Sequence, residues 1–409
     1  MGIYGALAQQ PGVVRVLASQ LLARFPFGML SIILLLHVQL AFGDFTSAGV
    51  VLAAQSVGQA ISGPLSGRIM GRFGMRPVLA VTSFVCTVLL VVIALAHMPL
   101  AAVAGVAGLI GLTTPPVTPA VRTLYPKLVP SKQLSALFSL DASAQEIIWV
   151  LGPVVAVFVS SQFGTTVGLC VAAGFMVLGG AWFIMSPAVG EVKLKQSKHR
   201  FGAVLRYPTV VIATAVGLFF VASMSAVEAG VVAAFAEDGH GGGHGSIESG
   251  IVLALFAGGS LVGGLLIGHR EMRPWSLALR IGIVLLGVAG ALVSLNIWWL
   301  STLLFLGGLG TAPAFASLSN IVASTVKFSE TAEAYGWVGM GQLVGVAAGS
   351  AFGGIAIDLL GARGAILVAA LVLLVAALLS LATMRWIPDL RGRTIEPPPE
   401  TGTLSIPLN

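Results

Sequence analysis

Residues 67–77 read GRIMGRFGMRP, a short stretch with three glycines and three arginines between long apolar runs. Parts of this stretch recur 197 residues later, where Met75-Arg76-Pro77 returns as Met272-Arg273-Pro274 and Gly67 and Gly71 return as Gly264 and Gly268. The same offset, without a gap, also relates Gly111 to Gly308, Gly152 to Gly349 and Gly164 to Gly361. A repeat of this length indicates a duplicated half, and many carrier folds are built from two such halves.

The composition indicates that most of this chain lies in a lipid bilayer and not in water. Apolar residues make up 57% of the sequence and charged residues 9%, whereas soluble domains carry about 25% charged residues. Apolar segments of roughly 20 residues, long enough to cross a bilayer, occur twelve times. They lie at about 16–41, 47–67, 77–97, 100–121, 135–160, 166–186, 208–235, 249–268, 276–295, 299–322, 333–357 and 364–384. We therefore predict an all-α polytopic membrane protein with twelve transmembrane helices in two pseudo-symmetric six-helix halves.

The repeat and the spans place the boundaries at the same points. Residues 1–186 form the N-terminal half, the basic segment 187–207 is a cytoplasmic linker, and residues 208–385 form the C-terminal half. The Pro-rich tail 386–409 has too little apolar content to fold, so we predict a disordered cytoplasmic tail. The first fifteen residues lack the features of a signal peptide, and we expect the first apolar stretch to remain as the first helix.

Charges in the connecting loops predict the orientation. One set of loops carries the basic residues Arg68, Arg72, Arg76, Arg122, Lys127, Lys132, Arg270 and Arg273. The opposite set carries the acidic residues Asp44, Glu237, Asp238, Glu248 and Asp358, with Arg363 as its one basic residue. Basic loops stay in the cytoplasm, so we expect a multi-pass protein of the cytoplasmic (inner) membrane with both termini on the cytoplasmic side.

The opening stretch resembles a loop motif of the major facilitator superfamily. That family places Gly-x-Leu-x-Asp-Arg-x-Gly-Arg-Arg/Lys between helices 2 and 3, and Gly67, Arg72, Gly74 and Arg76 match it. Gly71 stands where the family has an acid that helps to latch the two halves. The resemblance implies a major facilitator fold, a cavity lined by helices 1, 4, 7 and 10, and a gating role for this loop. The alternative is that Arg72 only anchors the topology.

Four ionisable residues stand out inside the expected spans, where such a residue costs at least ~2.5 kcal/mol at the bilayer centre unless it is paired or hydrated. They are Arg24, Asp141, Glu146 and Glu228, the candidates for proton coupling or substrate binding. At ~1.5 Å per residue, Arg24 and Glu146 reach similar depths, which predicts a buried ion pair, either functional or for packing only. Asp141 is expected at the cytoplasmic rim as a partner of Lys127, Lys132 or Arg122. Glu228, in the middle of its helix, would be neutralised by a proton, a substrate cation or an arginine.

Other positions suggest a bent helix and a cavity wall. Gly152-Pro153 predicts a bend in helix 5 beside Glu146. The prolines of Thr113-Thr114-Pro115-Pro116 and Thr311-Ala312-Pro313 predict breaks in helices 4 and 10. The residues expected to line the cavity are Phe27, Gln55, Gln59, Phe220, Met224 and Phe315.

The sequence offers no cofactor site. No Gly-x-x-x-x-Gly-Lys-Ser/Thr motif is present, so we expect the proton gradient, and not ATP, to supply the energy. His240 and His244 lie among glycines in an external loop, which we interpret as a linker rather than a metal site. Cys86 and Cys170 lack partners at metal spacing and are expected to be buried packing residues.

These features favour a secondary active transporter that works by alternating access, with proton-coupled efflux of a small amphipathic or drug-like compound as the expected activity. Proton-coupled uptake of a small nutrient is the alternative, because gradients and not the fold set the direction. A non-transporting receptor or scaffold is a remote alternative that leaves the buried acids unexplained. The expected partners are a small-molecule substrate, protons and the bilayer; the scattered basic residues argue against nucleic acid, and we expect a non-enzymatic monomer.

Overall fold

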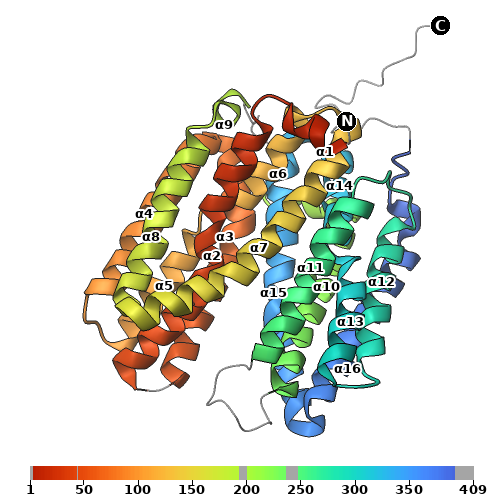
Figure 1. Ribbon diagram of the computed structural model, residues 1–409. Coiled ribbons are helices and arrows are strands. Elements are labelled where there is room, and N and C mark those ends of the chain that lie inside the picture. Colours follow the sequence, from red (N-terminus) through yellow and green to blue (C-terminus); the bar gives the residue numbers. More distant parts are fainter. Residues whose placement is uncertain (1–2, 44, 193–199, 236–246, 392–409) are drawn as a thin grey trace, which may run out of the picture.

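The computed structural model describes residues 3–43, 45–192, 200–235 and 247–391 (Figure 1). Within these ranges the chain is helical and contains no strand, as the composition predicts. The first six spans are α2 (Val13–Phe42), α3 (Phe45–Phe73), α4 (Met75–Leu95), α5 (Leu100–Leu112) with α6 (Val117–Leu128), α7 (Ser131–Phe163) and α8 (Thr165–Ile184). The last six are α10 (Pro208–Ala234), α11 (Ile247–Ile267), α12 (Ser276–Ala291), α13 (Ile297–Gly308) with α14 (Thr311–Thr325), α15 (Phe328–Leu360) and α16 (Ala362–Ala382).

Every predicted span corresponds to one of these segments. Ten are long and apolar enough to cross a bilayer, if α5 with α6 and α13 with α14 are each counted as one crossing. The other two are α12, which is apolar but shorter, and α3, which carries two glutamines and two arginines. Four short helices complete the described chain: α1 (Ile3–Ala8), α9 (Pro187–Glu191), η1 (Ala203–Arg206) and η2 (Met384–Trp386).

The two predicted helix breaks are confirmed. The chain leaves helical geometry between α5 and α6 at residues 113–116, and it turns between α13 and α14 at residues 309–310. In the second half the guanidinium of Arg280 of α12 donates to the Pro313 carbonyl at 3.0 Å and to the Ser317 hydroxyl, so α12 is bonded to the first turns of the helix that follows the break.

The duplication is visible in the turns as well as in the spans. Gly164 ends α7 with a φ of 88°, and its repeat mate Gly361 ends α15 with a φ of 67°. Both lie in the region that favours glycine, because a β-carbon is strained there. Each turn leads directly into the last span of its half.

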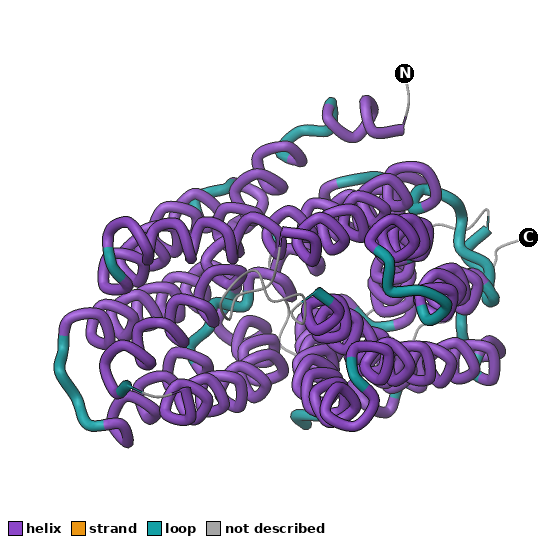
Figure 2. Tube along the Cα trace, turned by 60° about the horizontal axis from the view of Figure 1, so that its bottom comes forward, coloured by secondary structure: helices purple, strands orange, loops and turns teal. Residues whose placement is uncertain are grey.

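The twelve spans form two groups, α2 to α8 and α10 to α16, which Figures 1 and 2 show side by side. The groups meet where α3 packs on α15 and where α7 packs on α11 and α14. A β-carbon at Gly63 would meet the Gly336 carbonyl, and one at Gly67 would meet the backbone of Ala332 and Glu333. This close approach lies at the end of the bundle that holds α1 and α9, which we call the closed end.

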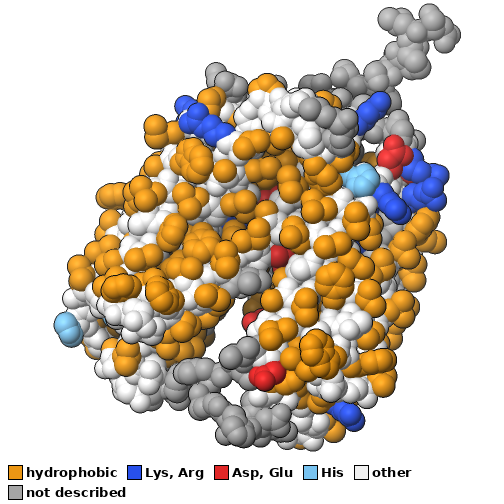
Figure 3. All heavy atoms as spheres, in the orientation of Figure 1, with side chains coloured by type: hydrophobic (Ala, Val, Ile, Leu, Met, Phe, Trp, Pro, Cys, Tyr) orange, Lys and Arg blue, Asp and Glu red, His pale blue; other side chains and the backbone are white. Residues whose placement is uncertain are grey.

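The opposite end of the bundle is hollowed between the two groups of helices (Figure 3). We call it the open end. The polar contacts that join the halves lie away from it: Ser139 of α7 donates to the Gly264 carbonyl of α11, and Asn320 of α14 donates to Ser135 of α7. Both α7 residues belong to the part of that helix nearer the closed end.

Ordered structure extends into the predicted tail. Ile387 and Leu390 are buried, and the Leu390 N–H donates to the Met272 carbonyl at 3.0 Å, which corrects the boundary at residue 386. Residues 392–409 of that tail, and residues 193–199 of the predicted linker, lie outside the described residues. The prediction of four chain segments otherwise stays a prediction.

Candidate functional site

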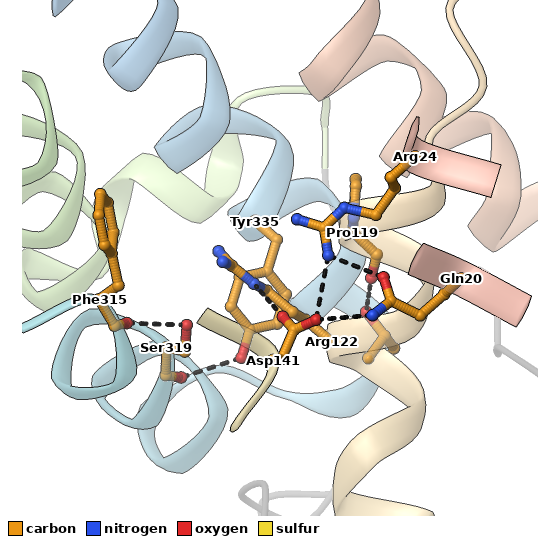
Figure 4. A network of polar contacts seen from close by, with 9 residues as sticks. Gln20, Arg24, Pro119, Arg122, Asp141, Phe315, Ser319 and Tyr335 are labelled. Carbon is orange, nitrogen blue, oxygen red and sulfur yellow. Dashed lines mark hydrogen bonds and ion pairs between the residues drawn. The ribbon is translucent and has the colours of Figure 1, made fainter. Parts of the chain in front are cut away.

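A buried charge cluster joins three helices of the first half near the closed end (Figure 4). Arg24 of α2 donates to Oδ1 of Asp141 of α7 at 3.0 Å, and Gln20, one turn before Arg24, donates to the same oxygen at 3.0 Å. Arg24 also donates to the Gln20 side-chain oxygen at 2.8 Å. Arg122 of α6 lies 3.7 Å from Oδ2 of Asp141, within ion-pair distance. The side chains of Arg24 and Asp141 are 2% and 1% exposed.

The cluster corrects the predicted ion pair. Arg24 pairs with Asp141 and not with Glu146. Five residues separate the two acids, or 140° of net rotation, so Asp141 faces α2 while Glu146 faces α11. Asp141 does contact Arg122, as predicted, but it is fully buried rather than at a rim. Two arginines and one aspartate give the cluster a formal charge of +1. Removal of the aspartate would leave two buried cations without a counter-charge, which is strongly destabilising.

The charge cluster also lies against the other half. Figure 4 shows Tyr335 of α15, with Ser319 and Phe315 of α14, on the side of Asp141 and Arg122 away from Gln20. The Tyr335 hydroxyl donates to the Ser319 carbonyl at 2.9 Å, which fixes the ring at this position. The seal between the halves therefore covers the cluster, and separation of the halves would uncover it.

Glu146 occupies the middle of the seam between the halves. It is the 16th of the 33 residues of α7, so it lies about halfway across the span. The Ser260 hydroxyl of α11 donates to Glu146 at 3.1 Å, and this bond crosses from one half to the other. Ser135 and Ser139, which also contact the other half, precede Glu146 on α7 and lie nearer the closed end. Glu146 is thus bonded to the other half farther from the closed end than these two serines.

A polar latch holds the closed end together. The Arg68 guanidinium at the end of α3 lies 3.5 Å from the Glu333 carboxylate of α15. Glu333 also accepts a 2.7 Å hydrogen bond from the Gly202 N–H of the segment that links the halves. The resemblance places the latching acid at the position of Gly71; here an acid of the opposite half makes the contact. The sequence analysis does not single out Glu333, because this residue begins an apolar span. An acid at the start of a helix in one half, with a basic loop at the same level in the other half, is the sequence signal that could have identified it.

The residues of the predicted gating loop lie in different surroundings, and their gating role stays a prediction. Gly67 lies at the close approach to α15, and Gly74 adopts a φ of 89° in the turn to α4. Arg72 is exposed and lies over the Phe73 ring, and Arg76 donates to the Ser186 carbonyl within its own half. In the described part of the loop, Gly67 meets the other half through its backbone, and Arg68 makes an ion pair with Glu333 of that half.

The remaining predicted site residues do not form one site. Glu228 is exposed and lies six residues before the end of α10, so its expected position in the middle of a buried helix is wrong. Phe220 is fully buried and packs edge-to-face on Phe315, with ring centres 5.2 Å apart, so it belongs to the core and not to a cavity wall. Gln55 is likewise buried.

Several smaller expectations have mixed outcomes. The half-buried residues Phe27, Gln59, Met224 and Phe315 stay predicted wall residues. Gly152 packs directly on Gly28 of α2, while α7 continues as a helix through Pro153.

Cys86 is buried as expected, but Cys170 is exposed. His240 and His244 lie outside the described residues.

The comparisons with known proteins agree with this architecture. The family model of the Major Facilitator Superfamily matches residues 16–279 and 273–407. Multidrug resistance protein MdtG of Salmonella typhimurium is 24% identical over 174 residues, which cover 42% of this chain and 43% of the relative. MdtG of Klebsiella pneumoniae is 23% identical over 188 residues, covering 45% of each chain. The match therefore spans less than half the length of these relatives.

Solved structures resemble the whole bundle. A bacterial homologue of the iron transporter ferroportin, in an outward-facing state, gives a TM-score of 0.70 at 13% identity, covering 91% of this chain and 98% of that one. The fucose:proton symporter of E. coli gives 0.68 at 16% identity with the same coverage, and the human organic anion transporter MFSD10 gives 0.67 at 15% identity, covering 91% and 100%. At these identities the likeness establishes a shared fold.

Proposed function

We propose that this chain, which belongs to the Major Facilitator Superfamily of transporters, is a secondary active exporter that works by alternating access. In this proposal the two halves seal the closed end and open the other, then exchange these states while a substrate is held between them. The energy comes from protons that move in the opposite direction to the substrate.

The observation that carries the proposal is the position of Glu146. Its carboxylate lies halfway along α7 and is bonded across the seam to Ser260, so any separation of the halves at this level changes its surroundings. A carboxylate at the bilayer centre is unfavourable unless it is protonated or paired. A proton bound there in one state and released in the other couples the gradient to the movement of the halves.

Two features favour export of a small amphipathic compound. The MdtG proteins that this chain resembles are named for multidrug resistance. The seam around Glu146 is largely apolar, which suits compounds with few charges. Uptake by the same machinery is the alternative, since the direction follows the gradients.

The sidedness belongs to the same proposal. The basic loops, including Arg68, Arg72 and Arg76, lie at the closed end, so we assign this end and both termini to the cytoplasm. The described arrangement is then the one in which the hollow between the halves faces outward. Glu228 is exposed near the open end and would meet the substrate on the outer side.

Purified protein reconstituted into vesicles tests the function. A panel of neutral, cationic and anionic amphipathic compounds is added after an imposed pH step, without ATP. We expect at least one compound to accumulate only while the pH step lasts, and to leave when an ionophore dissipates it. Accumulation that continues at zero proton and sodium gradient would remove secondary coupling from the account.

A further inference from the structure

Two arginines lie over two exposed tryptophan rings at the closed end of the second half. In the turn before α12, the guanidinium carbon of Arg273 lies 5.4 Å from the centre of the Trp275 ring. In η2, after α16, that of Arg385 lies 4.0 Å from the centre of the Trp386 ring. The two tryptophans are 43% and 42% exposed. We call these four residues the Arg-Trp patch.

Both pairs of the Arg-Trp patch belong to one surface. The chain after η2 returns to the turn before α12, where the Leu390 N–H donates to the Met272 carbonyl at 3.0 Å. Helices α12 and α16 pack on each other, so their ends carry the two pairs at the same level. Figure 3 shows basic side chains gathered at this end of the second half, on the right of the view.

The acids beside the patch do not neutralise its arginines. Asp389 binds Arg391 with a shortest distance of 2.6 Å between nitrogen and oxygen. This contact, together with the nearby charge of Glu271, raises the pKa of the Arg391 guanidinium. In the part of the chain that the structure describes, neither Arg273 nor Arg385 forms an ion pair with an acid. The patch therefore has positive charge available for an anion.

A buried arginine adds to this positive charge. Arg280 of α12 is buried, and its guanidinium donates to the carbonyls of Pro313 and Arg270 at 3.0 and 3.4 Å and to the Ser317 hydroxyl. These acceptors are neutral, and among the described residues no acid lies within ion-pair distance of Arg280. Its charge stays uncompensated behind the turn that carries Arg273.

Exposed apolar side chains continue from the patch along the membrane face. Leu279 and Leu286 of α12 are exposed and share one helix face with Trp275. Leu378 and Leu381 are exposed on the neighbouring helix α16. Side chains of this kind contact acyl chains in a bilayer, and tryptophan rings favour the level of the headgroups. The surface thus combines cations at the headgroup level with an apolar strip at the level of the lipid tails.

The internal repeat shows that the exposed rings are particular to the second half. At the offset of 197 residues, Trp275 and Trp386 correspond to Val78 and Val189 of the first half. These valines are buried, with 6% and 2% exposure. Two small core residues of one half are therefore replaced by two large exposed rings in the other.

The arginines differ between the halves in the same way. Arg273 corresponds to Arg76, which donates to the Ser186 carbonyl and is thus bound within its own half. Arg385 corresponds to Ala188, which carries no charge. A bias of basic residues toward one side of the membrane would apply to both halves. It does not explain why two arginines and two rings are presented together in the second half alone.

We propose that the Arg-Trp patch binds one anionic phospholipid of the leaflet at the closed end, with the phosphate on Arg273 and Arg385 and the acyl chains along the exposed leucines of α12 and α16. Guanidinium groups bind phosphate oxygens through charge-assisted hydrogen bonds, and basic surfaces at this level of a membrane recognise anionic headgroups. The site lies on the outer face of the second half, so the inference does not depend on the proposed transport.

Native mass spectrometry of the full chain, titrated with lipid in detergent, counts the bound lipids and measures their affinity. The probes are phosphatidylglycerol and phosphatidylcholine with identical acyl chains, because both carry a phosphate but choline cancels its charge. We expect one phosphatidylglycerol to bind at least about tenfold more tightly than phosphatidylcholine. Glycerol 3-phosphate, which has the phosphate without the chains, should not compete even in large excess.

A charge variant locates the site. Arg273→Gln combined with Arg385→Gln should abolish the preference for phosphatidylglycerol. The matched control is Arg72→Gln combined with Arg206→Gln, which also removes two exposed arginines from the closed end. This control should keep the wild-type preference. Thermal unfolding in detergent shows whether each variant is folded, and all four substituted side chains are exposed.

A second variant tests the rings. Trp275→Val combined with Trp386→Val gives the second half the residues that the first half carries at these positions. It keeps both arginines but removes the rings that position them, so phosphatidylglycerol binding should weaken about threefold or more.

Five results would overturn the proposal. The wild type could bind both lipids equally, or the arginine variant could retain the preference. The control could lose the preference to the same extent, which would reduce it to an effect of net charge. Affinity could be unchanged in the tryptophan variant. Glycerol 3-phosphate could displace the lipid, which would identify a site for soluble phosphate compounds instead.

Discussion

The Arg24 guanidinium donates to the Asp141 carboxylate at 3.0 Å, and both side chains are almost completely buried between α2 and α7. Arg122 lies on the other oxygen of the same carboxylate. One acid thus neutralises part of two buried cations, and Gln20 holds that acid in place. This arrangement ties three helices of the first half together through buried charges.

Removal of that acid should destabilise the protein. Asp141→Asn leaves Arg24 and Arg122 without a counter-charge, which we expect to lower stability by about 3–5 kcal/mol. Adding Arg24→Met should restore part of the loss, because one stranded cation is then removed. Thermal unfolding of the purified variants in detergent measures both effects. Unchanged stability of Asp141→Asn would show that the cluster is solvated and not a buried network.

The close approach of α3 and α15 predicts a contrast between two glycines of the same loop motif. A β-carbon at Gly67 would meet the backbone of Ala332 and Glu333, whereas one at Gly71 would have only the Ser329 carbonyl nearby, at 3.8 Å. Gly67→Ala should therefore disfavour the closed seal by about 1–3 kcal/mol and slow transport, while Gly71→Ala should behave like the wild type. Initial rates in vesicles measure the difference. Equal rates for the two variants would refute a tight seal at Gly67.

The latch predicts a shift in conformation. Glu333→Gln removes the charge that binds Arg68 and the Gly202 N–H, and each such bond contributes about 1.5–3 kcal/mol. We expect the closed end to separate in a larger fraction of molecules, as measured by distances between spin labels placed on α3 and α15. Glu248→Gln, an exposed change at the start of α11, is the control and should leave the distances unchanged. A Glu333→Gln distribution identical to that of the wild type would assign the seal to the glycine contacts alone.

The sidedness can be tested with single cysteines in a Cys170→Ser background, in which the remaining Cys86 is buried. Phe73 and Leu360 are 61% and 65% exposed and end α3 and α15, at opposite ends of the bundle. We expect an impermeant thiol reagent outside intact cells to label Leu360→Cys and not Phe73→Cys. The reverse pattern would invert the orientation.

The fold could be predicted from the sequence because the lengths of the apolar segments and the spacing of the repeat determine where the helices lie. Twelve apolar segments, two proline breaks and the 197-residue offset locate the helices, and each recurs in the structure. The pairing of Arg24 could not be predicted in the same way. Depth along a helix follows from counting residues, but the direction of a side chain around the axis depends on which neighbour lies there, and a sequence does not state that Asp141 faces α2.

The contacts between the two halves could not be predicted from the sequence for the same reason. Glu146 was expected to matter because a charge inside a span is unfavourable, yet its partner Ser260 is an ordinary residue of an apolar helix. Glu333 has a sequence signal, an acid at a helix start opposite a basic loop, but its contact requires two segments 265 residues apart to meet. Helices in isolation do not predict such contacts between halves.

The most direct test of the account is gradient-driven accumulation by Glu146→Gln, measured with whichever compound the wild type accumulates in vesicles. Gln has nearly the same volume as Glu but cannot exchange a proton, so the account predicts that the pH step drives no accumulation by this variant. Asp358→Asn, an exposed change two residues before the end of α15, is the control and should still accumulate the compound. Wild-type accumulation by a stably folded Glu146→Gln variant would contradict the claim that Glu146 couples protons to transport.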